Sequence, residues 1–358
     1  MAETSHPYAT LAPDAFWRSA VAERDAMEIT GLWKPKFPIT QDMRIVTAGS
    51  CFAQHISRAV QERGFNWYNA ETAPGSAELA RRYNYGVFSF RTGNIYTTRM
   101  LNQWFRWARR PDDCPDIYWT SDLGFQDPFR PNIEPDGFAT LSEARASRRA
   151  VLAAVGDAMR KADIFVFTLG LTECWRSADG QIEFAACPGT SAGHFDPVEH
   201  VFHNMGFKDV TRELSRALAN LRAVNKRVKI LLTVSPVPLT ATASGQHVLT
   251  ATSHSKAILR AAAGTIAAEH EDVDYFPSYE IITHPVWGGR FYAENRRSVL
   301  PEGVAFVMDQ FFAAIGAEAA AAPKQKPRRA TMTADTDDLV CEEEMLAAFA
   351  PNSTRGAS

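Results

Sequence analysis

Residues 44–65 read RIVTAGSCFAQHISRAVQERGF, and this stretch decides the class of fold. The run Arg44–Ala48 is rich in β-branched and small apolar residues, which is typical of a buried strand. Apolar residues then recur at helical spacing, at Phe52, Ile56, Val60 and Phe65. Only a glycine and a serine separate the two patterns. A strand that passes through a tight turn directly into a helix predicts the opening of an α/β domain.

The same alternation continues along the chain. Continuous apolar runs predict central strands at Ile164–Leu169 (IFVFTL) and Val228–Val234 (VKILLTV), and a short strand at Val273–Phe276. Helical patterns fall between them and after them, at 97–108, 142–162, 209–223, 253–270 and 303–315. Strands that alternate with helices form a parallel sheet covered on both faces. We therefore expect a three-layer α/β/α fold.

The sequence divides into three parts. Residues 1–40 predict an N-terminal arm with one short helix near Asp14–Ala26. Residues 41–318 form the domain, in which 66–140 are an irregular cover that includes the helix at 97–108, and 176–207 are a loop-rich excursion. Residues 319–358 are a flexible linker and an acidic tail, with one amphipathic helix expected at Asp337–Phe349.

Bulk composition excludes several classes of protein. The 358 residues carry a net charge of −3, so no basic field attracts nucleic acid or an anionic membrane. The five cysteines show no CxxC spacing, which argues against a zinc site and a disulfide framework. The N-terminus does not read as a signal peptide, and no apolar run is long enough to span a membrane. We expect a cytoplasmic protein that needs no metal and no cofactor.

Ser50 is the strongest candidate for chemistry. It follows Gly49 where the strand ends and the helix begins, and sites in open α/β sheets lie at the carboxyl ends of strands. The positive end of the helix dipole and unpaired N–H groups favour an oxyanion there. The same position also suits an ordinary N-cap serine, and Cys51 is a rival nucleophile.

The pentapeptide Gly49-Ser50-Cys51-Phe52-Ala53 and its flanks resemble the signature of the GSCFA-domain family. The similarity extends over most of residues 5–318, including HPYATLAPDAFWRSAV near the N-terminus and the segment SYEI. That family is similar to the SGNH/GDSL hydrolases, which have a flavodoxin-like sheet. The resemblance implies a serine-dependent acyl ester hydrolase or O-acyltransferase. Its substrate would be an acylated glycan or a small ester, with an acyl donor in the case of transfer.

The SGNH/GDSL superfamily has four sequence blocks that contribute to its active site, and this sequence matches them in part. The first block makes Ser50 the nucleophile, with its backbone N–H in the oxyanion hole. The second contributes a glycine N–H, matched best by Gly86, with Gly93-Asn94 as the second choice. The third is Gly-x-Asn-Asp, and here the chain reads Gly170-Leu171-Thr172-Glu173. An ionised Glu173 cannot donate to an oxyanion, so the Thr172 hydroxyl, a protonated Glu173 or a substrate contact must fill that role.

The fourth block, Asp-x-x-His, lacks its histidine, because residues 294–302 read ENRRSVLPE. A base for Ser50 must come from elsewhere. His247 is the first choice because it follows the strand VKILLTV at the carboxyl edge of the sheet. His284 is second, and His254, expected inside a helix, is third. The acid that orients the histidine would be Glu280 in the SYEI segment.

Three other readings remain open. His194, His200 and His203 cluster with acidic residues, but a polar loop explains them better than a metal site. A degenerate hydrolase fold could bind a glycan without turning it over. The acidic tail could recruit a protein partner, which would make the chain a scaffold.

Overall fold

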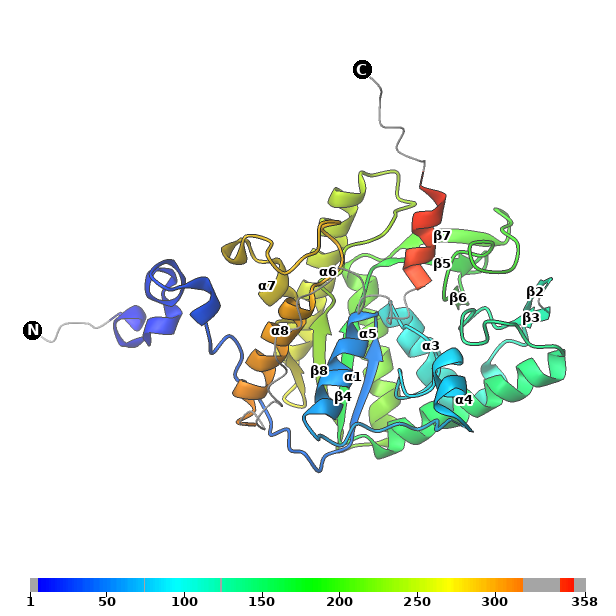
Figure 1. The fold of residues 1–358 in the computed structure, drawn as a ribbon, viewed down its shortest axis with the longest axis horizontal. Coiled ribbons are helices and arrows are strands. Elements are labelled where there is room, and N and C mark those ends of the chain that lie inside the picture. Colours follow the sequence, from blue (N-terminus) through cyan, green and yellow to red (C-terminus); the bar gives the residue numbers. More distant parts are fainter. Residues whose placement is uncertain (1–5, 74, 123, 318–341, 351–358) are drawn as a thin grey trace, which may run out of the picture.

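A four-stranded parallel sheet forms the centre of the domain (Figure 1). The computed structural model describes residues 6–73, 75–122, 124–317 and 342–350. The strands are ordered β1-β4-β8-β9, and each neighbouring pair is parallel. Their bounds are β1 Ile45–Gly49, β4 Ile164–Leu169, β8 Lys229–Val234 and β9 Val273–Tyr275. The predicted strands are confirmed, because runs of apolar residues on both faces can only be buried between two layers.

Helices cover both faces of the sheet and complete the three layers. One face packs against α3 Thr98–Arg109, α4 Leu141–Lys161, α5 Phe207–Val224 and α6 Val248–Glu269. The other face packs against α1 Phe52–Glu62, α7 Ser278–Thr283 and α8 Pro301–Ala314. The predicted α/β/α architecture is therefore confirmed.

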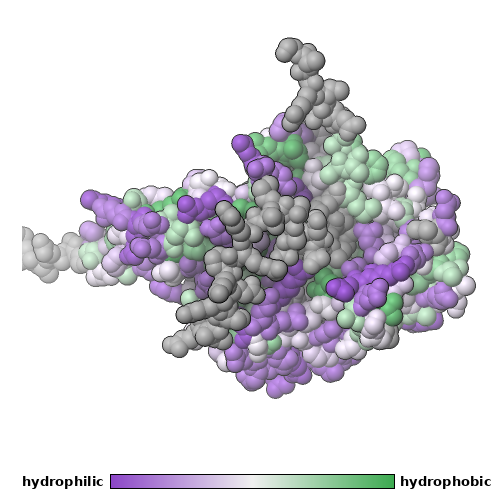
Figure 2. Space-filling model, in the orientation of Figure 1, coloured by the Kyte–Doolittle hydropathy of each residue, from purple (hydrophilic) through white to green (hydrophobic). Residues whose placement is uncertain are grey.

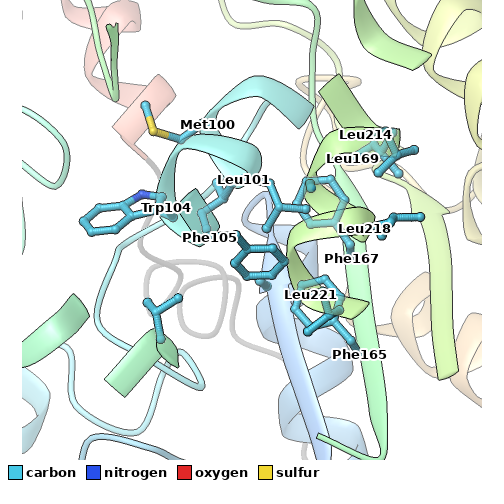
Figure 3. Packing of buried hydrophobic residues seen from close by; sticks show 14 of the residues in the cluster. Met100, Leu101, Trp104, Phe105, Phe165, Phe167, Leu169, Leu214, Leu218 and Leu221 are labelled. Atoms are coloured by element: carbon cyan, nitrogen blue, oxygen red, sulfur yellow. The ribbon is translucent and has the colours of Figure 1, made fainter. Parts of the chain in front are cut away.

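The core on the first face joins two helices to the central strand (Figure 3). Leu101 and Phe105 of α3 meet Phe165 and Phe167 of β4, and leucines of α5 pack beside them. Phe105 and Phe167 are fully buried. Burying a side chain of this size contributes about 2–3 kcal/mol, so this face anchors α3 firmly.

Residues 66–140 are only partly the irregular cover that we expected. They contain α2 Ala77–Arg82 and a small antiparallel hairpin of β2 Trp119–Ser121 and β3 Gly124–Gln126. Helix α3 is no cover, because its apolar face is part of the main core. The segment is fixed by Asp127, which lies fully buried between Arg130 and Arg148. Burial alone would raise the pKa of Asp127, but the two arginines lower it below its ordinary value.

Outside the main sheet, the structure adds detail to two sequence predictions. The short helix predicted near Asp14–Ala26 is a single turn of π-helix, Arg18–Ala22, between the 3₁₀ turns Pro7–Thr10, Pro13–Ala15 and Ala26–Glu28. The residues of the arm are mostly exposed, so no packed face stabilises a longer helix. The excursion at 176–207 is rich in loops, as expected, but it also carries an antiparallel sheet of order β6-β5-β7. Its strands are β5 Glu173–Ser177, β6 Glu183–Phe184 and β7 His200–Asn204.

The tail contributes one short helix. The expected linker and residues 337–341 of the expected tail helix lie outside the described residues. Glu342–Phe349 form a 3₁₀ helix, η7, beside the β5–β7 sheet (Figure 1). Within the described ranges, no helix is long and apolar enough to cross a bilayer. The face in Figure 2 mixes hydrophilic and hydrophobic residues.

The fold leaves no room for a side chain at Gly49. Its φ is +137°, and a Cβ there would lie 2.4 Å from the Thr168 carbonyl oxygen. We expect Gly49→Ala to lower the free energy of unfolding by about 3 kcal/mol or more, since strain and overlap add. Urea denaturation would measure this loss. The control is Gly180→Ala, where φ is +68° and nothing lies within 4 Å. Equal urea midpoints for the two variants would contradict the argument.

Candidate functional site

Ser50 lies at the corner between β1 and α1, beneath the end of β4. Its N–H donates to the Thr168 carbonyl oxygen at 3.0 Å. Its hydroxyl is buried and has no hydrogen-bond partner. The residue is 2% exposed, and a Cβ placed on Gly170 would lie 3.1 Å from its own Cβ. The predicted role of the Ser50 N–H in the oxyanion hole is therefore wrong, because β4 already uses that donor.

Gly170 is brought against Ser50, as the block comparison implies. Its N–H and that of Leu171 both donate to the Tyr96 carbonyl oxygen, at 2.9 and 3.2 Å. Its carbonyl oxygen accepts from the buried Lys256 ammonium at 2.6 Å. A Cβ at Gly170 would lie 3.0 Å from Tyr96 and 3.1 Å from the Ser50 Cβ, so a side chain here would require these neighbours to shift. The turn after β4 is thus fixed by two backbone donors and one lysine.

Thr172 and Glu173 have structural partners. The Thr172 hydroxyl donates to Asn204 Oδ1 at 2.6 Å, and its N–H donates to Ser255 Oγ at 3.1 Å. Glu173 accepts from the Thr242 hydroxyl at 2.5 Å and from the Ala243 N–H at 3.3 Å. In this structure neither residue donates toward Ser50. Together they tie β5 to β7, to α6 and to the loop before α6.

Of the two candidate matches to the second block, the structure places the Gly93-Asn94 segment, and not Gly86, near Ser50. Gly86 lies in an exposed turn, and a Cβ there would touch nothing within 4 Å. The Ile95 N–H, in contrast, donates to the Gly49 carbonyl oxygen at 2.7 Å, which places the Gly93-Asn94 segment beside the nucleophile turn. The buried Asn94 accepts from Gln54 of α1 at 3.1 Å. Our second choice is thus the better-placed one, because backbone pairing draws it to the end of β1.

The candidate bases occupy helix ends or helix surfaces. His247 is the exposed N-cap of α6, where its Nδ1 accepts from the Leu249 N–H at 3.2 Å. Helix α6 begins five residues earlier than predicted, so His247 is the last residue of the loop that precedes it. His284 caps the short turn Pro285–Trp287 and contacts the rings of Trp17 and Trp287. His254 is exposed within α6, as expected. No hydrogen bond to Ser50 is recorded for any of the three.

Glu280 does not orient a histidine. Its carboxylate pairs with Arg260, and it accepts from the Tyr275 hydroxyl at 2.9 Å. Both of its oxygens are therefore engaged by residues of α6 and β9. The expected Glu280–histidine pair is not formed in this structure, because Arg260 is the stronger electrostatic partner.

The histidines at 194–203 belong to the β5–β7 region. His200 Nδ1 accepts from the Asp196 N–H at 3.0 Å, and its ring packs on Phe184 and Phe195. His203 lies 3.7 Å from Asp209. Across the described ranges, no group of three His, Cys, Asp or Glu side chains could hold a metal ion.

A family model described as the GSCFA family matches residues 44–311, which run from the start of β1 into α8. The chain belongs to the GSCFA family. Comparison with curated proteins returned no match. The relation of the GSCFA fold to SGNH hydrolases stays a prediction.

A pocket of about 350 Å³ opens next to the GSCFA pentapeptide. Asn94 and Tyr96, which border the Ser50 turn, also line this pocket. Its walls are largely apolar and include Trp175 and Phe202 from the antiparallel sheet. Leu346 and Phe349 of η7 complete it. The C-terminal segment of this GSCFA protein thus contributes to the pocket wall.

Glu183 is the unusual group in this pocket. It is 2% exposed, and its Oε2 has no hydrogen-bond partner. Burial raises its pKa to about 7, although the Thr97 hydroxyl, Arg99 and Arg176 pull it downward. A buried carboxyl with a raised pKa in a cleft is a marker of functional sites.

Sequence reasoning missed Lys256 and Glu183. Lys256 falls among Ala251, Ser255 and Leu259 on the buried face of α6, and a lysine on such a face was a usable signal. Glu183 gave no comparable signal, since its burial depends on a two-residue strand paired to β5.

The raised pKa of Glu183 predicts a dependence of stability on pH. The folded state holds its proton up to about pH 7, whereas an unfolded glutamate releases it near its ordinary value of 4.5. The free energy of unfolding should therefore fall as pH rises between these values, by at most about 1.4 kcal/mol per pH unit. Glu183→Gln cannot titrate and should lose this contribution. Urea titrations of both proteins from pH 5 to pH 8 would test it, and parallel pH profiles would refute it.

Proposed function

We propose that this protein is a serine-dependent acyl ester hydrolase or O-acyltransferase, with Ser50 as its nucleophile. The observation that carries the proposal is the Ser50 hydroxyl, which lies buried without a hydrogen bond at the carboxyl end of β1. A buried hydroxyl without a partner costs about 1–3 kcal/mol, so a purely structural role explains it poorly. The substrate would be an acylated glycan or a small ester.

The chemistry requires a base, and His247 is the proposed one. Val248, its neighbour, packs in one cluster with Tyr96, Leu171 and Leu239, so the start of α6 borders the turn above Ser50. While Nδ1 accepts the capping bond, the neutral ring carries its proton on Nε2, so His247 acts as the base only once Nδ1 leaves the cap and faces the substrate. His284 is the weaker candidate, since it lies in an aromatic cluster with Trp17.

In the proposed reaction, Ser50 Oγ attacks the ester carbonyl carbon and its proton passes to His247. The oxyanion would lie at the N-terminus of α1, where the helix dipole stabilises negative charge. The C–O bond breaks, and His247 returns the proton to the departing alcohol. Water or a sugar hydroxyl then attacks the acyl-serine in the same way. Because the hydroxyl is covered here, the segment around Tyr96 or Gly170 must shift as substrate enters.

Covalent labelling tests the nucleophile. A fluorophosphonate probe should label the wild-type protein, and Ser50→Ala should abolish the label because the attacking oxygen is gone. Intact-mass spectrometry would measure both. Cys51→Ala is the matched control and should still label. Loss of the label in Cys51→Ala, with retention in Ser50→Ala, would transfer the nucleophile to Cys51. No label in any form would favour a glycan-binding module on a degenerate fold.

Substitution of the proposed base gives a second test. His247→Gln should lower kcat for p-nitrophenyl acetate by about 10²–10⁴-fold, the usual contribution of general base catalysis. Since His254 is exposed on the same helix, His254→Gln is the control and should retain wild-type kcat. Steady-state kinetics from pH 5 to pH 9 would compare the two. Equal kcat values would exclude His247 as the base.

A further inference from the structure

Hydrogen bonds fix the backbone of Glu183 and one of its two carboxylate oxygens. Its backbone N–H donates to Gln103 Oε1 at 3.0 Å, and its carbonyl oxygen accepts from Gln103 Nε2 at 2.8 Å. The carboxylate Oε1 accepts from the Thr97 hydroxyl. Thr97 is the N-cap of α3, so the whole arrangement rests on a core helix. Oε2 has no hydrogen-bond partner by geometry, and the neighbouring Cys174 thiol, a weak donor, is the remaining side chain that acts on the carboxyl group.

That oxygen belongs to a residue of the pocket wall. Glu183 lines the pocket together with Tyr96, Trp175, Phe184 and Phe202. Flat aromatic walls suit a ring or an apolar chain, and a few placed polar groups set its orientation. A fixed polar atom that is buried without a hydrogen-bond partner loses free energy unless a ligand supplies that partner. The pocket is therefore suited to a ligand with a hydrogen-bonding group at this point.

The charges around the pocket indicate whether the ligand group that bonds to Glu183 is neutral or cationic. The described lining residues include no lysine, arginine or histidine, so no group there would bind a phosphate or carboxylate. The charges of Arg99 and Arg176 act on Glu183 from outside the lining. They partly offset the negative charge of Glu183. With that balance in place, a neutral hydroxyl fits better than an ammonium group.

We propose that this pocket binds the neutral, hydroxyl-bearing acyl acceptor, with Glu183 Oε2 hydrogen-bonded to one of its hydroxyl groups, which can donate to the carboxylate or accept from the protonated acid. The role as acceptor rests on the proposed function, whereas the binding of a hydroxylated ring does not. Asn94 and Tyr96 connect this pocket to the Ser50 turn, so a bound acceptor would lie beside the acyl-serine.

Binding to the full-length Ser50→Ala protein tests the proposal without turnover. The probes are the methyl glycosides of glucose, galactose and mannose, and butylammonium as the cationic probe. Saturation-transfer NMR and tryptophan fluorescence would report binding, since Trp175 lines the pocket. We expect at least one glycoside to bind at millimolar concentration or better, and more tightly than butylammonium.

Two substitutions added to that protein separate the chemistries. Glu183→Met removes the polar group and should weaken the glycoside at least 10-fold. Glu183→Gln should stay within about threefold, because a hydroxyl can also accept from an amide whereas an ammonium cannot. Glu213→Gln is the control for a buried carboxylate outside the pocket, whose oxygens already bond Asn102, Arg212 and Arg216.

Several results would overturn the proposal: no glycoside binding, preferential binding of butylammonium, or unchanged glycoside affinity in Glu183→Met. Loss of affinity in Glu183→Gln equal to that in Glu183→Met would also overturn it, since it would indicate a charged partner. If Glu183→Met fails to fold, the Glu183→Gln comparison of glycoside with butylammonium still decides. These outcomes are independent of fluorophosphonate labelling at Ser50, so either proposal can fail alone.

Discussion

The close approach of two strand ends is the constraint on which the site depends. β1 and β4 pair in parallel so tightly that Gly49 lies against the backbone of Thr168, and the next residue is pinned to the same strand. Any side chain at Gly49 would push the strands apart and move Ser50. Because the position of the serine follows from backbone pairing, it is set by the most rigid element of the domain.

Polar groups buried above the sheet extend this constraint outward. Lys256 holds the carbonyl oxygen of Gly170, and Ser255 holds the N–H of Thr172. Adjacent residues of α6 thus fix the turn after β4 from one side, while Tyr96 fixes it from the other. A network in which each member has a partner specifies one arrangement of the chain. The same turn leads into β5, so the position of the pocket follows from that of the serine.

The sequence predicted what depends on local pattern. The apolar runs of β4 and β8 and the helical spacing after Gly49 are strong signals, because a buried element must carry its hydrophobic pattern in its own residues. The β5–β7 sheet, in contrast, was not predicted. Strands as short as Glu183–Phe184 have too few residues to show a period, and their pairing is decided by partners elsewhere in the chain.

The sequence alone therefore determined the α/β class, the family signature and the place of Ser50 at a strand-to-helix corner. Tertiary structure alone decided which groups surround it. It placed Asn94, rather than Gly86, beside the turn and paired Glu280 with Arg260. It also buried Glu183 with one carboxylate oxygen that accepts no hydrogen bond. The reason is physical: a strand or helix is encoded by neighbours in sequence, whereas hydrogen-bond partners and burial arise only when distant segments pack together.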